Sequence, residues 1–305
     1  LENFEIKRTH HHLNHAASAY FGCRVNRNDK YLVLTLDGGG DQDCSHVYEV
    51  AEGNFRLLAK TQVGHSIGNI YSRITYLLGM LPHSHEYKIM GLAPYANTKY
   101  SKEISKIFFS YLDLDKKNYL KFKKKIKENT SEIIPRLAED LKFQRFDNIS
   151  GGIQMYCEEL IVKWIKECIK KTNIKKVLCA GGVFMNIKAT KVISEIDELE
   201  YFDVFPSCGD ETLPFGSIWL NNKKETQING VNKLNTLYLG NETNFNLVEA
   251  EKKYKEELNF EYFENINDKI ASLIADKEIV SRCSGKMEFG ARALGNRSIL
   301  ASPSD

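Results

Sequence analysis

Hydrophobic and polar positions follow a period of two in the first part of the chain. The alternation covers SHVYEV (45–50) and FRLLAKTQ (55–62), and before them YLVLTLDGGG (31–40) predicts a buried strand that runs into a glycine turn. Such patterning, separated by glycine and aspartate turns, predicts an antiparallel meander of three strands with DGGGDQD as its first hairpin. Before it, AASAYFG (16–22) predicts a short helix whose small side chains allow close packing.

Apolar residues then recur three and four positions apart, which predicts helices. The pattern runs through GNIYSRITYLLGM (68–80) and KEISKIFFSYLDL (102–114) and is clearest in ISGGIQMYCEELIVKWIKECIKKTN (149–173). Between the last two lies the lysine-rich KKNYLKFKKKIKEN (116–129). It favours a solvated helix or loop edge, with contact to a phosphate-rich partner as the alternative.

Strand and helix patterns alternate after residue 174. KKVLCAGGVFMNIKATKVI (175–193) predicts a strand, a glycine turn and a helix, followed by the strand YFDVFPS (201–207) and the helix LPFGSIWLNN (213–222). This is αβ layering, with a strand-to-helix turn of the kind that holds a nucleotide. A polar stretch near residues 222–240 predicts a domain boundary, because a new βα pattern follows it.

Composition and charge exclude several classes of protein. The chain of 305 residues is 42% hydrophobic and 27% charged with a net charge of +2, which is typical of a globular protein without a dedicated nucleic-acid surface. Its seven cysteines are scattered without a C-x-x-C pair, which favours reduced thiols in a cytoplasmic protein. The chain has no run of about 18 apolar residues, so no segment is predicted to insert into a membrane. The absence of an initial methionine suggests a piece of a longer polypeptide.

Two histidines form the first candidate metal pair. His11 and His15 lie four residues apart, and a helix places both imidazoles on one face, as two ligands of one ion require. The positive end of the helix dipole favours the neutral, ligating form of the ring. The alternative is an ordinary surface or core histidine pair.

Two carboxylates are candidates for the missing ligands, since a catalytic metal needs three or more protein ligands. Asp37 follows the apolar strand VLTL and precedes three glycines, among them Gly38 and Gly39, whose bare backbone allows a phosphate to approach. Asp210 in PSCGDETLPFG also follows a strand and opens a helix. The alternatives are a turn aspartate and an N-cap, respectively.

Two further groups of residues suggest phosphate or nucleotide binding. Gly181 and Gly182 stand between a buried strand and a helix, where close packing is the competing explanation. Arg292 and Arg297, followed by Ser298, lie among glycines in GKMEFGARALGNRSIL, and fork-shaped guanidiniums suit phosphate or carboxylate.

Seven segments, taken in order, resemble the O-carbamoyltransferases of the nodulation-protein-U type. They are HHLNHAASAY, LDGGGD, GHSIGNIYS, EYKIMGLAPY, CAGGVFMN, PSCGDETLPFGS and GKMEFGARALGNRSIL, and the match runs from about His11 to Leu300. The resemblance implies an α/β fold: an actin-like (sugar-kinase/ASKHA) ATPase-type domain over residues 1–225, then the beginning of a smaller YrdC-like α/β domain over residues 236–305. It also implies that the family's segment before the histidines and the remainder of its second domain are missing.

The family's chemistry is implied in the same way. It forms carbamoyl adenylate from carbamoyl phosphate and ATP in the smaller domain and transfers the carbamoyl group to a hydroxyl of a small molecule, sugar or nucleoside. A divalent metal lies near the phosphates, Fe²⁺ first, with Mg²⁺, Mn²⁺ or Zn²⁺ as alternatives.

Residue roles carry over by motif. His11, His15 and Asp210 would bind the metal, with Asp37 as a fourth ligand or a phosphate-side partner beside Gly38 and Gly39. Gly181, Gly182 and Asn186 would line the nucleotide, with Lys88 near the same cleft. Arg292, Arg297 and Ser298 would hold carbamoyl phosphate, and His12 is a candidate base for the hydroxyl.

Two other functions stay open at this stage. One is a truncated, non-catalytic nucleotide- or metal-binding remnant, or a split enzyme completed by a second chain. The other is a tRNA threonylcarbamoyl transferase, against which the MEFGARALGNRS segment and the near-neutral charge argue. The family's usual proline before RALG is Ala291 here.

Overall fold

The computed structural model describes residues 6–222, 236–242 and 246–303. The chain forms two compact units, residues 1–233 and 234–305. The predicted link between the domains, residues 226–235, lies outside the described residues. The domain limits expected from the sequence, residues 1–225 and 236–305, therefore remain a prediction.

A five-stranded sheet is the centre of the first unit, in the order β3-β2-β1-β6-β7. The strands β1 (Tyr31–Gly40), β2 (Asp43–Ala51) and β3 (Asn54–Gln62) form the predicted antiparallel meander. The strands β6 (Lys176–Ala180) and β7 (Tyr201–Val204) continue it in parallel with β1. The carboxyl ends of β1 and β6 therefore meet at one edge, where loops can gather side chains.

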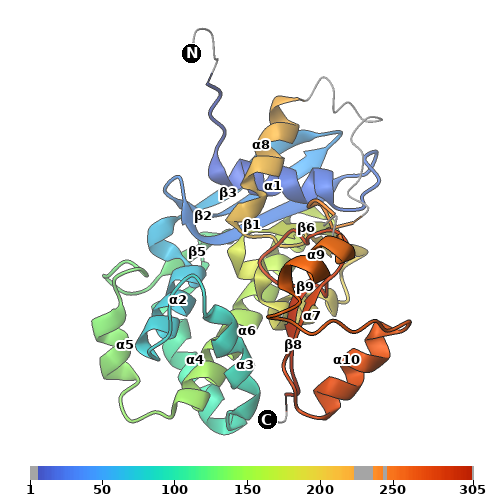
Figure 1. Ribbon diagram of the computed structural model, residues 1–305. Coiled ribbons are helices and arrows are strands. Elements are labelled where there is room, and N and C mark those ends of the chain that lie inside the picture. The colour runs from blue at the N-terminus through green and yellow to red at the C-terminus, as the bar shows by residue number, and fades with distance from the viewer. Residues whose placement is uncertain (1–5, 223–235, 243–245, 304–305) are drawn as a thin grey trace. The chain divides into compact units, whose positions relative to one another are not determined.

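Helices cover both faces of this sheet (Figure 1). On one face lie α1 (His11–Gly22), which contacts β1, β2 and β6, and α8 (Leu213–Asn221), which packs on α1. On the other lie α2 (Ile67–Leu77), the long α6 (Phe146–Thr172) and α7 (Ile187–Ser194). The remaining helices of this unit are α3 (Glu86–Leu92), α4 (Thr98–Tyr111), α5 (Ile134–Asp140) and the 3₁₀ turns η1 (Val63–His65), η2 (Ala93–Tyr95), η3 (Gly182–Met185) and η4 (Asp210–Thr212).

The prediction for the lysine-rich stretch was wrong. A hairpin of β4 (Leu112–Asp115) and β5 (Asn118–Lys124) replaces both the end of the predicted helix and the predicted helix or loop edge. Leu120 and Phe122 are buried on one face of β5, and Phe122 packs against the ring of Trp164. Lys121 lies between them and Lys123 follows Phe122, so β5 alternates buried apolar residues with lysines.

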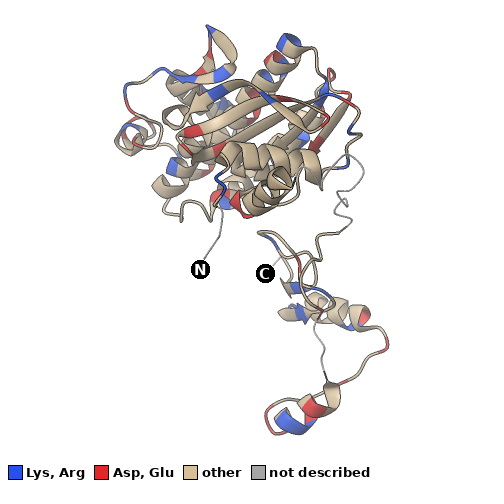
Figure 2. Ribbon diagram, turned by 90° about the horizontal axis from the view of Figure 1, so that it is seen from above, with Lys and Arg blue, Asp and Glu red and all other residues tan. Residues whose placement is uncertain are grey.

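The second unit has two helices and a small sheet. They are α9 (Leu247–Tyr254), α10 (Ile266–Ala275) and the antiparallel strands β8 (Val280–Cys283) and β9 (Arg297–Leu300). The predicted α/β class is confirmed, with a mixed sheet at the centre of the first unit. Acidic and basic residues are interspersed over the chain (Figure 2). In the described residues every helix is too short or too polar to cross a bilayer.

Close packing of α8 on α1 fixes the helix that carries the candidate histidines. Gly216 of α8 lies so near the backbone of α1 that an added Cβ would stand 1.9 Å from the carbonyl oxygen of Asn14. The buried residues Ala16, Ala17 and Ala19 allow α1 the same close approach to the sheet. The position of α1 therefore depends on small residues at the contact.

We expect Gly216→Ala to destabilise the first unit by about 1–3 kcal/mol, because the methyl group overlaps backbone that cannot rotate away. Gly91→Ala in α3 is the control, since nothing lies within 4 Å of its Cβ position. Alanine in that exposed helix should be neutral or stabilising by about 0.5–1 kcal/mol. Chemical denaturation of both variants measures this, and equal midpoints would contradict the packing described.

Candidate functional site

The start of α1 places two imidazoles against the end of β1. His10 is the N-cap residue of α1, and the Asp41 carboxylate at the hairpin tip accepts a hydrogen bond of 2.7 Å from the backbone N–H of His11. This ties the first turn of the helix to the β1–β2 hairpin. As the spacing predicts, His11 and His15 share one face of the helix.

Four side chains converge there. The Nε2 atoms of His11 and His15 are 3.2 Å apart, and they lie 3.2 and 3.1 Å from Oδ2 of Asp37. Oδ1 of Asp210, from η4, lies 3.5 Å from His11 Nε2 and 3.3 Å from His15 Nε2. The structure thus brings together all four residues predicted as metal ligands, and we call them the four-residue cluster.

These separations suit a single cation. For metal–ligand bonds of about 2.1 Å, neighbouring donors are about 3.0 Å apart in an octahedron and about 3.4 Å in a tetrahedron. Two imidazole nitrogens and two carboxylate oxygens also match Fe²⁺, Mn²⁺ or Zn²⁺ better than Mg²⁺, which prefers oxygen ligands and water. The residues therefore fit a divalent transition metal in both geometry and donor type.

Charge at the cluster favours a cation as well. Desolvation raises the pKa of Asp37, but hydrogen bonds from His11 and His15 outweigh it and hold that pKa well below its ordinary value. Desolvation lowers the pKa of His15, and the hydrogen bonds to Asp210 and Asp37 outweigh it, so the net pKa is raised. The raised pKa of His15 means that the two carboxylates favour positive charge at its imidazole.

Burial differs across the cluster. The side chain of His15 is 0% exposed and that of Asp37 is 16% exposed, whereas that of Asp210 is 68% exposed. The Nδ1 atom of His15 is buried, and the described residues provide no acceptor for a hydrogen bond from it. The cluster is closed on the side of α1 and open at Asp210, which is the side from which a ligand can enter.

Asp37 is held by the backbone around it. Its Oδ1 accepts the N–H of Gly38 at 2.7 Å, and its carbonyl accepts the hydroxyl of Ser66 at 3.1 Å. A Cβ on Gly182 would stand 3.0 Å from Asp37 Oδ1. The glycine of the β6 turn therefore leaves room for this carboxylate.

The glycines after Asp37 are also explained by close contacts. A Cβ on Gly39 would stand 2.3 Å from the side chain of Val63, and one on Gly40 would stand 2.3 Å from the ring of His11. Gly38 has more room, with Asn69 Oδ1 at 3.5 Å. The end of β1 carries glycines because the side chains of Val63 and His11 occupy the space that larger residues would need.

The predicted nucleotide-lining residues lie at the end of β6. Gly181 has φ +106° and sits against β1, where a Cβ would stand 2.3 Å from the Leu36 carbonyl oxygen, so close packing accounts for it. Asn186 caps α7 through a hydrogen bond from the Ala189 N–H and exchanges two hydrogen bonds with Gln154. Gly182 borders the four-residue cluster through Asp37.

His12, the candidate base, faces the interior. Its Nε2 lies 3.0 Å from the carbonyl oxygen of Asp43, which only accepts, so Nε2 carries the hydrogen and Nδ1 accepts from the Thr35 hydroxyl at 2.9 Å. Its side chain is fully buried, and desolvation lowers its pKa to about 3. Both ring nitrogens are hydrogen-bonded in the interior, which favours a structural role for His12 over that of a base.

Lys88, the remaining candidate in the first unit, is exposed on α3. Its Nζ lies 5.9 Å from the ring centre of Tyr87. In the described residues it has no hydrogen bond or ion pair with the four-residue cluster.

The predicted carbamoyl-phosphate residues lie in the second unit. The guanidinium of Arg297 donates to the carbonyls of Ser284, Gly285 and Asn296, so it ties two loops together. Ser298 Oγ accepts the N–H of Gly295, while Arg292 is exposed.

Glu288 has a structural role beside these residues that the sequence did not reveal. Its Oε1 accepts the N–H groups of Leu294, Asn296 and Arg297. Desolvation raises its pKa, but hydrogen bonds from these backbone groups and its own outweigh this and lower the pKa to about 2. An ionised Glu288 therefore shapes the RALGNR loop.

A second histidine cluster was also missed. Asp43 Oδ2 lies 3.0 Å from His46 Nε2 and 3.6 Å from His10 Nε2. His10 Nδ1 already accepts the N–H of His12, which leaves Nε2 protonated, and Lys60 Nζ lies 3.3 Å from the same carboxylate oxygen. These features make it a buried hydrogen-bond network rather than a cation site.

Two family models match this chain, and both describe carbamoyltransferases. A family model described as the carbamoyltransferase N-terminus matches residues 2–217, and one described as the carbamoyltransferase C-terminus matches residues 271–305.

Three individual proteins illustrate what the chain is similar to. An uncharacterized protein of Methanocaldococcus jannaschii is 31% identical over 99% of this chain and 52% of its own length. Nodulation protein NolNO of Sinorhizobium fredii is 29% identical over 96% of this chain and 43% of its own length. The chain spans about half the length of these relatives. Among solved structures, component A of the Acidaminococcus fermentans (R)-2-hydroxyglutaryl-CoA dehydratase is 16% identical with a TM-score of 0.41, covering 70% of this chain and 68% of that one.

We expect His15→Ala to weaken binding of Mn²⁺, Fe²⁺ or Zn²⁺ by more than about 100-fold, because it removes a ligand rather than an outer partner. His83→Asn, at an exposed position with φ +63°, removes a histidine elsewhere and should leave affinity unchanged. Isothermal titration with each metal measures both. Equal affinity of His15→Ala and the parent would contradict the four-residue cluster as a metal site.

We also expect Glu288→Gln to speed amide exchange over residues 294–297, because a neutral amide holds the three N–H groups less strongly. With its pKa lowered from 4.5 to about 2, the carboxylate stabilises this loop above pH 4.5, and that contribution is lost as the pH falls towards 2. Glu278→Gln is the matched control. Unchanged exchange in Glu288→Gln at neutral pH would refute this role.

Proposed function

Because the chain belongs to the carbamoyltransferase family, as the match over residues 2–217 shows, we propose that it carries the transfer site of a metal- and ATP-dependent O-carbamoyltransferase. The resemblance seen in the sequence is confirmed by this match and by the nodulation proteins. The acceptor, the activated intermediate and the metal are part of the proposal.

The observation that carries the proposal is the convergence of His11, His15, Asp37 and Asp210. Two are predicted from helix spacing and two from strand ends, and all four donors lie within 4.8 Å of one another. A divalent cation held there would act as a Lewis acid on carbamoyl and phosphate oxygens.

In the proposed reaction, the acceptor oxygen bonds to the carbamoyl carbon of carbamoyl adenylate. The bond from that carbon to the adenylate oxygen breaks, AMP leaves, and the hydroxyl proton goes to solvent or a base. Water would cleave carbamoyl phosphate to carbamate and phosphate, and a carbamate oxygen would then bond to the α-phosphorus of ATP, with pyrophosphate leaving, to give carbamoyl adenylate. The reaction splits one difficult transfer into two steps.

The described residues would contribute position and charge. Asp37 is fixed by Gly38 and Ser66, so its carboxylate needs little reorganisation when a ligand enters. Gly38, which has more room than Gly39 and Gly40, would let a phosphate oxygen approach the backbone next to that carboxylate. Among the described residues we assign no base, since both nitrogens of His12 are hydrogen-bonded in the interior.

The test is ATP-dependent consumption of carbamoyl phosphate, with AMP formation, by the metal-loaded chain and by the longest version of the gene product. We expect turnover in at least one of them, and a loss of more than about 100-fold in His15→Ala because a metal ligand is removed. His83→Asn should turn over like the parent.

Activity only in the longer form would fit the proposed transfer unit that requires its activating half. No turnover in either form, with metal bound, would favour the non-catalytic remnant. Full turnover by His15→Ala would contradict the role of the four-residue cluster.

A further inference from the structure

The tip of the β1–β2 hairpin is a two-residue turn with left-handed backbone. Gly40 pairs with Asp43, so Asp41 and Gln42 form the turn, and their φ angles are +50° and +71°. Positive φ at both central residues is the property of a type I′ turn, which favours asparagine, aspartate or glycine first and glycine second. Gln42 therefore stands at a position that suits glycine, and this sequence is not the one that makes the turn most stable.

The β2–β3 hairpin of the same sheet has a turn of the same kind for comparison. Ala51 pairs with Asn54, and the two residues between them, Glu52 and Gly53, have φ angles of +49° and +73°. Here glycine stands second, as the turn favours. Glu52 is exposed, and its carboxylate has no hydrogen bond or ion pair with the described residues. The two turns therefore differ in what their acidic residue contacts.

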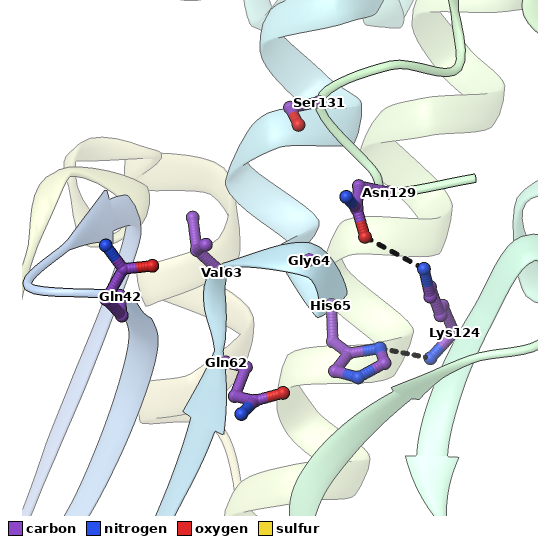
Figure 3. Close-up of a pocket in the computed structure, with 8 residues that line it drawn as sticks. All are labelled: Gln42, Gln62, Val63, Gly64, His65, Lys124, Asn129 and Ser131. Atoms are coloured by element: carbon purple, nitrogen blue, oxygen red, sulfur yellow. Dashed lines mark hydrogen bonds between the residues drawn. The ribbon is translucent and has the colours of Figure 1, made fainter. Parts of the chain in front are cut away.

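Asp41 reaches from its turn to the start of α1. Its Oδ2 accepts the backbone N–H of His11 at 2.7 Å. The neighbouring Gly40 lies so close to the His11 ring that an added Cβ would stand 2.3 Å from it. Gln42 lies on the other side of the tip, where it lines a cavity with Val63 (Figure 3). The hairpin therefore contacts both the backbone and the ring of His11, and Asp41 makes the polar one of these contacts.

The charge of Asp41 also matters at this place. The first turn of α1 contains no acidic residue, so the side chains of the helix do not offset the positive end of its dipole. A cation held by His11 and His15 would lie near that end and would be repelled by it. The Asp41 carboxylate brings a negative charge to the same turn from another segment of the chain.

From these observations we propose that Asp41 is a positioning residue for the metal site. It holds the first turn of α1 against the hairpin, which keeps the His11 ring beside Asp37, and it offsets the helix dipole that the cation would meet. Asp41 acts through the backbone of His11 and is not one of the four donors. The inference rests on the metal site of the proposed function but does not depend on turnover.

The test combines calorimetric titration with Mn²⁺ and chemical denaturation of the same variants. Asp41→Gly removes the acceptor but suits the positive φ, so its unfolding midpoint should stay close to that of the parent. Its affinity for Mn²⁺ should fall by about 10-fold, at the low end of the losses seen when outer partners of metal ligands are removed. Asp41→Asn keeps an acceptor and loses the charge, so affinity should fall by only about 2–5-fold.

Two variants separate the role of the carboxylate from that of the turn. Gln42→Gly gives the hairpin tip the Asp-Gly sequence that a type I′ turn favours, and it should raise the unfolding midpoint without changing the affinity for Mn²⁺. Glu52→Gly makes the matched change at the β2–β3 turn, where the acidic residue has no contact with α1. It should also bind Mn²⁺ like the parent.

The outcomes distinguish this inference from the proposed function. Binding of Mn²⁺ to Asp41→Gly with the affinity of the parent would overturn the role of Asp41 and leave the proposed function intact. Equal losses of affinity in Asp41→Gly and Glu52→Gly would overturn it too, because the effect would then be general. If Asp41→Gly does not fold, the affinity of the parent in Asp41→Asn overturns the inference. A parent chain that binds no Mn²⁺ would contradict the metal site itself, and with it the proposed function.

Discussion

The attraction between the buried imidazole of His15 and the carboxylate of Asp37, 3.1 Å apart, is the contact on which the site depends. It requires the first turns of α1 to lie against the end of β1. Small residues in α1, Gly216 in α8 and Gly40 in β1 permit that approach, and any larger side chain would meet backbone or the His11 ring. The geometry of the four-residue cluster therefore depends on the close packing of α1 against the sheet.

Buried polar residues beside this contact form a second set of interactions. The Thr35 hydroxyl, the His12 ring and the Asp43 backbone form one buried series of hydrogen bonds, and the Asp43 carboxylate extends it to His46. Buried polar groups that are satisfied in this way fix a unique arrangement of the elements that carry them. We infer that the series holds α1 in register on the meander, so that His11 and His15 face Asp37 and do not rotate away from it.

Much of this architecture was predictable, because it is encoded locally. The spacing of His11 and His15 on a helix, and the place of Asp37 at a strand end, required only the periods of helix and strand. Contacts between distant segments were not predictable. Nothing in the sequence identifies the distant His10 as a partner of Asp43, and even at short range the three backbone N–H groups bound by Glu288 become visible only in the folded loop. The β5 strand was missed because its two buried apolar residues, Leu120 and Phe122, stand within a run of lysines.

The most direct test of the central claim is a crystal structure of the chain with Mn²⁺ or Fe²⁺, with anomalous scattering measured at the edge of the metal. The account predicts an anomalous peak about 2.1 Å from Nε2 of both His11 and His15 and from the carboxylates of Asp37 and Asp210. A peak at His10, Asp43 and His46 instead, or no peak in any part of the protein at saturating metal, would contradict it.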